Sequence, residues 1–217
     1  MKNVISFSLW GDKSLYLSGA IWNATNFRRF YPDWSMRIYH DGTVPSDTLV
    51  TLGALGVELR RMPDAVDCMG LYWRFNPMFD DPTIERFIVR DTDSRINQRE
   101  VDAVNYWIES GKPLHIIRDC ESHDIPILGG TWGAIAGCVP MFNERMGAWM
   151  TMLRPCYNNP RGAFHGSDQM FLQTVLWPMF ANNHVAHIRA GVEKLKFTGQ
   201  EIELPELVNN EYIGRVW

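Results

Sequence analysis

Two carboxylates spaced one residue apart follow the most strand-like segment in the middle of the chain. Asp91 and Asp93 come directly after the apolar run 87–89, which is typical of a buried strand. If the chain turns just past that strand, both carboxylates face one point in space. Two hard oxygen ligands at one point suit Mg²⁺ or Mn²⁺, and such an ion in turn suits a diphosphate. The segment 86–95 therefore predicts a strand that leads into a metal–nucleotide site.

A D-x-D pair is a weak signal by itself, and the alternative interpretation is a solvated loop after a strand. The position of the pair favours the metal site, because ligand sites of open α/β sheets lie at the carboxyl ends of strands. Arg90 and Arg95 flank the pair. Their forked donors could contact phosphate, or the two arginines could be surface ion-pair partners.

A second cluster follows the first strand-like run, at Trp10, Gly11, Asp12 and Tyr16. The end of the first strand is a common nucleotide site, and Tyr16 could stack on a base. The alternative is that the aromatic residues only pack against the first helix. Both interpretations stay open on the sequence.

Arg74 stands among aromatic residues, at 72–75. An arginine in such surroundings is expected to be partly buried and to need an anion. Either a diphosphate or a structural carboxylate would serve.

Two further clusters carry histidine. Asp168 and Gln169 follow His165, and their simplest interpretation is a helix start with an acid in its first turn. His184 and His187 lie near a late strand-like run. A neutral imidazole is a good third ligand for Mn²⁺ beside two carboxylates, although a single histidine near a strand is more often structural.

The composition limits the function classes. The chain has 217 residues and a net charge of −4, and 46% of its residues are apolar. Without a basic run, nucleic acid and anionic membranes are unlikely partners. No signal peptide precedes the first strand, and no stretch reaches the ~20 apolar residues of a membrane helix. The four cysteines show no C-x-x-C spacing, which favours reduced thiols in a cytoplasmic protein.

Alternating strands and helices predict an α/β fold with a largely parallel, Rossmann-like sheet. Strands are expected at 4–9, 36–39, 57–60, 86–90 and 114–117, and helices at 14–30, 46–55, 70–79 and 99–109, with Ser46 as a cap. The second half is less regular. It predicts a loop at 118–132, helices at 143–153 and 167–177, and little periodicity after 198. We expect one domain over 1–217, which its apolar end suggests is the N-terminal part of a longer chain.

These motifs occur in one order along the chain. They are W-G-D at 10–12, W-R-F at 73–75, F-I-V-R-D-T-D-S-R at 87–95, I-L-G-G-T-W-G at 127–133, S-D-Q-M-F-L at 167–172, and a late histidine. Together they resemble the GT-A glycosyltransferases over about residues 3 to 215. The similarity is greatest to small bacterial and viral members, those of chlorella viruses included.

The resemblance implies a GT-A fold with a central, mostly parallel mixed sheet flanked by helices. It also implies a metal-dependent enzyme that moves a hexose from a UDP-sugar to a glycan acceptor hydroxyl, with retention. In this resemblance Asp91, Asp93 and His187 hold Mn²⁺ or Mg²⁺, with His184 as the alternative histidine. The donor contacts it implies are Ser8, Trp10, Asp12, Tyr16, Arg74, Arg90, Asp91, Gly130 and Trp132.

On the reacting side, the resemblance places Asp168 and Gln169 beside the anomeric carbon. Asp119 and Asp124 are rival candidates for that role. Two other functions fit the same sequence, namely a sugar-nucleotide-binding module without turnover and a metal-dependent nucleotidyltransferase. The latter normally carries a glycine-rich basic loop after its first strand, and residues 10–13 are a poor version of one. The oligomeric state is left undetermined by the sequence.

Overall fold

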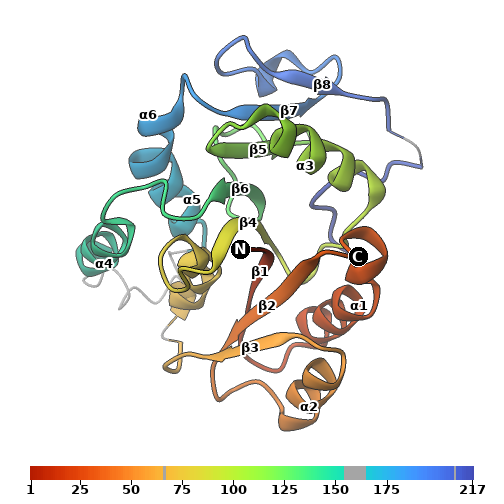
Figure 1. Cartoon of the computed structure of the whole chain (residues 1–217), viewed down its shortest axis with the longest axis vertical. Coiled ribbons are helices and arrows are strands. Elements are labelled where there is room, and N and C mark those ends of the chain that lie inside the picture. Colours follow the sequence, from red (N-terminus) through yellow and green to blue (C-terminus); the bar gives the residue numbers. More distant parts are fainter. Residues whose placement is uncertain (66, 154–164, 208) are drawn as a thin grey trace.

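The computed structural model describes residues 1–65, 67–153, 165–207 and 209–217. Within them, one sheet of eight strands runs in the order β3-β2-β1-β4-β6-β5-β7-β8 (Figure 1). The strands are β1 (Lys2–Leu9), β2 (Trp34–His40), β3 (Glu58–Arg61), β4 (Ile84–Arg90), β5 (Leu114–Arg118), β6 (Thr131–Ile135), β7 (Val185–Arg189) and β8 (Ile202–Leu204).

Helices cover both faces of this sheet. They are α1 (Ser14–Phe30), α2 (Ser46–Ala54), the 3₁₀ helix η1 (Asp67–Met78), α3 (Gln98–Ser110), α4 (Phe142–Leu153), α5 (Ser167–Phe171), the π-helical η3 (Leu172–Leu176), α6 (Trp177–Phe180) and the short 3₁₀ turn η4 (Glu193–Leu195). The α/β fold with a mostly parallel sheet is therefore confirmed.

Strand direction decides where a site can form. β1 pairs in parallel with β2 and β4, and β5 pairs in parallel with β7. β6 runs antiparallel to both of its neighbours, β4 and β5. The carboxyl ends of β1, β4, β5 and β7 therefore open on one edge of the sheet, where α/β proteins bind their ligands.

The two faces of the sheet bury separate cores. Phe87 and Val89 of β4 point to the side of η1, α4 and α5, whereas Ile88 points to the side of α1 and α3. Because both faces are covered, β4 reads as a continuous apolar run rather than as an alternating one. Figure 1 shows the two helix groups on opposite sides of the sheet.

The predicted elements of the first half are confirmed with small shifts in their bounds and caps, and those of the second half need larger corrections. The expected loop 118–132 already enters β6 at Thr131, and the helix expected at 167–177 continues to Phe180 through a π-helical turn. The 57–60 strand lies at Glu58–Arg61. Ser46 is the first residue of α2 rather than its cap, because Pro45 occupies the cap position.

The structure bears on two predictions, that no helix spans a membrane and that the cysteines are reduced. No helix among the described residues combines the length and the apolar character that a membrane crossing requires. Cys120 and Cys138 carry free thiols, and Cys156 lies outside the described residues.

Candidate active site

The D-x-D turn begins directly after β4, at the carboxyl edge of the sheet. Ser94 closes the turn, since its backbone N–H and its hydroxyl both donate to the Asp91 carbonyl, at 3.3 and 2.9 Å. Asn23 of α1 binds the backbone of the turn through its side chain. Its side-chain amide donates to the carbonyls of Thr92 and Ser94, at 3.3 and 2.8 Å, and its carbonyl accepts from the Ile96 N–H at 3.2 Å.

Sequence reasoning did not single out Asn23 or its neighbour Gly19. Asn23 is fully buried, and a Cβ at Gly19 would collide with the Thr92 carbonyl oxygen. Both residues lie on the apolar face of α1 that also carries Ala20 and Phe27. A polar residue and a glycine on a buried helix face were the available signal, because a buried amide needs partners.

Arg74 joins two acidic residues that are distant in sequence. One of its terminal nitrogens donates to the Asp91 carboxylate, and the other donates to Asp168 at 2.8 Å. Arg74 and Asp168 are buried, whereas 46% of the Asp91 side chain is exposed. Burial of Arg74 opposes its charge, but the two carboxylates outweigh burial and raise the pKa of Arg74. The prediction that Arg74 needs an anion is met by Asp91 and Asp168.

Two serines of β1 hold the backbone of Arg74. The Ser6 hydroxyl donates to the Arg74 carbonyl at 2.7 Å, and the Arg74 N–H donates to the Ser8 hydroxyl at 3.0 Å. Ser8, which we predicted to contact the nucleotide, thus contacts the segment that carries Arg74.

The glycine pair directly before β6 lets these groups meet. A Cβ at Gly129 would collide with the Asp168 carboxylate and would lie 2.7 Å from a terminal nitrogen of Arg74. A Cβ at Gly130 would collide with the Asp91 carboxylate. Because neither glycine has a side chain, the backbone approaches the Arg74–Asp91–Asp168 cluster closely.

Asp93 lies within electrostatic range of three further groups. Burial and the charge of Asp91 raise the pKa of Asp93, and Arg74 and His165 offset part of that rise. Burial also raises the pKa of Tyr16, with Asp93 and Asp91 adding to the effect. Tyr16 therefore lies within electrostatic range of the D-x-D carboxylates. His165 is exposed and lies within the same range of Asp93, and we had not predicted it as a site residue.

The W-G-D segment lies next to η1. Trp10 packs edge-to-face on Trp73, with ring centroids 6.1 Å apart. The Gly11 N–H donates to the Thr43 hydroxyl at 2.7 Å, which ties the end of β1 to the loop after β2. Asp12 is exposed to solvent.

The structure does not bring His187 to the D-x-D turn. β7 is separated from β4 by two strands, and one ring nitrogen of His187 shares a hydrogen bond of 3.0 Å with His115 on β5. Tyr106 of α3 packs edge-on against the ring. Burial lowers the pKa of His187 to about 4. His184 is also engaged elsewhere, since its Nδ1 lies 2.9 Å from the Phe180 carbonyl.

Two other predicted donor contacts lie in the core. Arg90 is buried under α3, where its Nε is 2.9 Å from the Glu100 carboxylate. Trp132 is fully buried in β6 and packs edge-to-face on Phe75 and Phe87. Both side chains belong to the packing behind the edge of the sheet.

Asp119 and Asp124, the other candidates for the reacting side, lie in different surroundings from Asp168. Asp119 is fully buried and accepts two hydrogen bonds from Arg99, at 2.6 and 2.8 Å, and a third from the Ile213 N–H. That carboxylate anchors α3 and a later segment. Asp124 is exposed, whereas Asp168 is buried against Arg74, and Gln169 is half-buried in the same helical turn.

The D-x-D turn fits a divalent cation through its oxygen donors. Among the described residues, no group of three histidine, cysteine or acidic side chains could hold a metal ion alone. Two adjacent carboxylates still suit Mg²⁺ or Mn²⁺, because such ions are commonly bound by one or two carboxylates, with phosphates and water completing the shell. Asp91 and Asp93 are the residues that would hold it.

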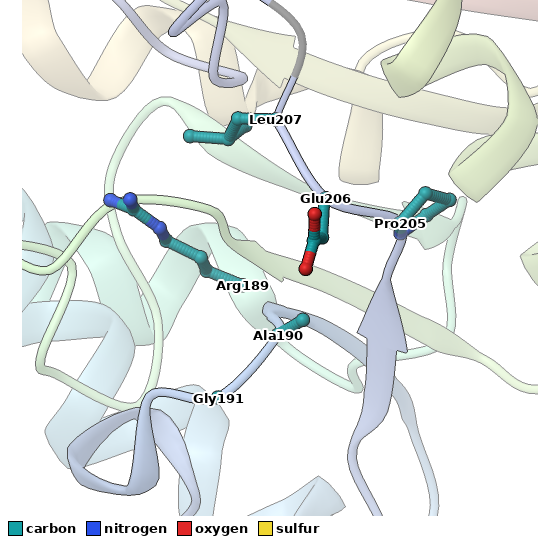
Figure 2. A pocket seen from close by; sticks show the side chains of 6 residues that line it. All are labelled: Arg189, Ala190, Gly191, Pro205, Glu206 and Leu207. Atoms are coloured by element: carbon teal, nitrogen blue, oxygen red, sulfur yellow. The ribbon is translucent and has the colours of Figure 1, made fainter.

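A hollow of about 380 Å³ lies at the same edge of the sheet, past the ends of β7 and β8 (Figure 2). It is lined by Arg189, Ala190, Gly191, Pro205, Glu206 and Leu207. None of these six residues belongs to the Arg74–Asp91–Asp168 cluster, so the hollow is distinct from that cluster.

Comparison with known proteins gives a likeness of fold. No family model and no curated protein matches the sequence. The chain is similar to a structure from Desulfovibrio desulfuricans G20 assigned as a nucleotide-diphospho-sugar transferase, with a TM-score of 0.51 and 9% identity over 86% of this chain and 80% of that one. It is also similar to a glycosyltransferase involved in glycosylation of the major capsid of PBCV-1, with a TM-score of 0.49 and 11% identity over 87% and 82%. At 9% identity the first likeness shows the fold, which is the GT-A-like fold that the motifs predict.

Proposed function

We propose that the protein is a metal-dependent glycosyltransferase that moves a hexose from a UDP-sugar to a hydroxyl of a glycan acceptor. The observation that carries the proposal is the acidic D-x-D turn at the end of β4, with Arg74 joining Asp91 to Asp168. The fold supports it, because sites of open α/β sheets form at this edge, and the solved structure with the same fold was assigned as a sugar-nucleotide transferase.

The first requirement of such a site is to stabilise the leaving diphosphate. Negative charge grows on it during transfer, and cationic groups in a water-poor cleft stabilise that charge. Asp91 and Asp93 would hold Mn²⁺ or Mg²⁺, which would supply Lewis-acid stabilisation of the leaving oxygens. Arg74 adds a fixed positive charge at the same place, and Ser6 and Ser8 hold its backbone there.

The second requirement is to stabilise the sugar as its bond to the diphosphate breaks. Positive charge grows at the anomeric carbon as the bond to the diphosphate breaks. Asp168 is a buried carboxylate, and its bond to Arg74 fixes its orientation. We assign Asp168 to stabilisation of the developing positive charge on the front face, which fits a retaining reaction. Gln169 would serve the sugar hydroxyls.

The nucleotide is assigned to the end of β1. Tyr16 lies near the D-x-D carboxylates, and Trp10 is half-buried against Trp73. Tyr16 and Trp10 offer aromatic rings that are suited to stacking on a base and contacting its ribose. Uridine is our choice of base because of the resemblance to the GT-A enzymes.

The test is transfer activity with a panel of UDP-sugars and Mn²⁺, followed as UDP release with and without glycan acceptors. Asp93→Ala should abolish Mn²⁺-dependent UDP binding in calorimetry while the fold stays intact. The matched control is Asp102→Ala, which removes an exposed carboxylate from α3. UDP binding that stays tight in Asp93→Ala without metal would overturn the metal assignment. Binding of UDP-sugars without any turnover would favour the binding-module alternative.

A further inference from the structure

Two arginine guanidinium groups lie over two tryptophan rings beside the D-x-D turn. The Arg95 guanidinium lies 5.0 Å from the ring centroid of Trp22 on α1 and 4.8 Å from that of Trp217. Arg215 lies 4.5 Å from the ring centroid of Trp217. We call these four side chains, Trp22, Arg95, Trp217 and Arg215, the stack. Each guanidinium-over-ring contact is a favourable cation–π pair.

Backbone contacts join the same segment to the turn itself. Val216 forms an antiparallel bridge with Ser94, and the Trp217 N–H donates to the Asp93 carbonyl at 3.2 Å. The segment thus binds the backbone of the very residue that we assign to the metal.

The other end of this segment is anchored in the core. Ile213 is fully buried with Ile117 and Leu204 under α3, and its N–H donates to Asp119 at 3.0 Å. Gly214, at φ +88°, packs on Thr131 at the start of β6. Residues 212–217, which we call the C-terminal strap, therefore cross the edge of the sheet from β5 to the D-x-D turn.

We propose that the C-terminal strap positions the D-x-D turn for the metal and the donor diphosphate, with Arg95 and Trp217 as positioning residues. This inference rests on the proposed function. Asn23 fixes the inner side of the turn, and the strap fixes its outer side. A metal site needs its ligands held within roughly 0.5 Å, so support on both sides of the turn suits a metal site.

The stack carries positioning rather than overall stability. Trp217 is 45% exposed, and its contacts lie at the surface, where a cation–π pair contributes little to folding. Loss of the stack should therefore loosen the turn while the sheet stays folded. That combination separates a positioning role from a merely structural one.

The test compares Trp217→Ala with Trp217→Phe and Arg95→Lys. We expect amide hydrogen exchange of residues 92–94 to accelerate in Trp217→Ala, and the affinity for UDP with Mn²⁺ to fall roughly tenfold, as expected when two cation–π pairs are lost. Trp217→Phe keeps an aromatic ring, so its amide exchange and its UDP affinity should both be close to those of the parent. Arg95→Lys keeps the charge but loses the planar stacking group. Its exchange rate and its UDP affinity should therefore lie between those of the parent and those of Trp217→Ala.

Arg29→Lys is the matched control, because Arg29 covers the Phe30 ring at 5.5 Å on the same helix but away from the turn. It should change neither exchange nor affinity. Unchanged exchange of 92–94 in both Trp217→Ala and Arg95→Lys would overturn the positioning proposal. If the parent protein fails to bind UDP, the proposed function fails, and the exchange measurement still decides the role of the strap.

Discussion

At the residue scale, Arg74 organises the candidate site because its two ends meet different carboxylates. Asp91 is exposed enough to meet a ligand, whereas Asp168 is buried. Either carboxylate can balance the charge of the buried guanidinium, so Arg74 keeps a charged partner if the other carboxylate is lost. The glycines at 129 and 130 are required at this place, since any side chain there would enter the space of the two carboxylates.

The role of Asp168 gives a kinetic prediction. Asp168→Asn keeps the shape and removes the negative charge, so UDP affinity should change little while kcat for transfer falls by roughly 10²-fold or more, as when a group acting in the transition state is lost. Steady-state kinetics and calorimetry with UDP and Mn²⁺ measure both quantities.

Asp124→Asn is the comparison variant, because Asp124 was its rival and is exposed. It should transfer at the parental rate. A parental rate in Asp168→Asn, with a loss in Asp124→Asn, would move the reacting face to Asp124 and leave Asp168 as a partner of Arg74.

At the element scale, α1 supports the D-x-D turn through Asn23. Three backbone groups of the turn region depend on this one amide, namely the carbonyls of Thr92 and Ser94 and the N–H of Ile96. Gly19 brings the helix near enough for these bonds. The turn after β4 and the helix α1 thus support each other.

Asn23→Ala should lower the free energy of unfolding by about 1–3 kcal/mol, because it leaves buried polar groups without partners. Urea unfolding measures the change. Asn26→Ala is the matched control, since Asn26 lies on the same helix and its side chain donates only to the Trp22 carbonyl. If Asn23→Ala were as stable as this control, the turn would not depend on α1.

The elements also show what the sequence could predict. Strands such as β4 were readable because both of their faces are buried, which makes them continuous apolar runs. β7 was harder to assign because His187 interrupts its apolar character, and the partner that explains this histidine, His115, lies 72 residues away. β6 begins with Thr131 and contains Gly133, so nothing marks it locally as a strand.

The candidate site was predictable in the same uneven way. The carboxylate pair at 91 and 93 was found because strand and ligands are contiguous in sequence. The need of Arg74 for an anion was also readable, but Asp168 is 94 residues from it. The placement of Trp132, Arg90 and Asp119 in structural contacts could not be predicted, because each depends on a pairing between distant elements.

At the scale of the whole molecule, buried ionisable groups hold the sheet on both sides of the site. Arg37 on β2 is fully buried and pairs with Glu58 at 2.8 Å and with Asp81 at 2.6 Å. Arg118 on β5 pairs with Glu201 at 3.0 Å, with both side chains buried. Burial lowers the pKa of Arg118 to about 10, against the charge of Glu201. These pairs fix β2 to β3 and β5 to the segment before β8.

The His115–His187 pair joins β5 to β7 and makes stability depend on pH. Burial lowers the pKa of both rings, to about 4 for His187, and for His115 the neighbouring His187 and Arg90 lower it further. Both rings are therefore neutral in the folded chain at neutral pH. The unfolded chain takes up protons at its ordinary histidine pKa of about 6.5, so it binds more protons than the folded chain between about pH 6.5 and 4.

Stability should accordingly be full above about pH 6.5 and fall as the pH drops from there toward 4, with His187 alone contributing on the order of 3 kcal/mol to that loss. Urea unfolding at a series of pH values measures it. His187→Gln should flatten the curve in this window, because no proton is then taken up at that position on unfolding. His165→Gln, which changes an exposed ring, should keep the parental slope. An equal slope in His187→Gln and the parent would show that acid sensitivity arises elsewhere, with His123 and His184, whose pKa burial also lowers, the next groups to examine.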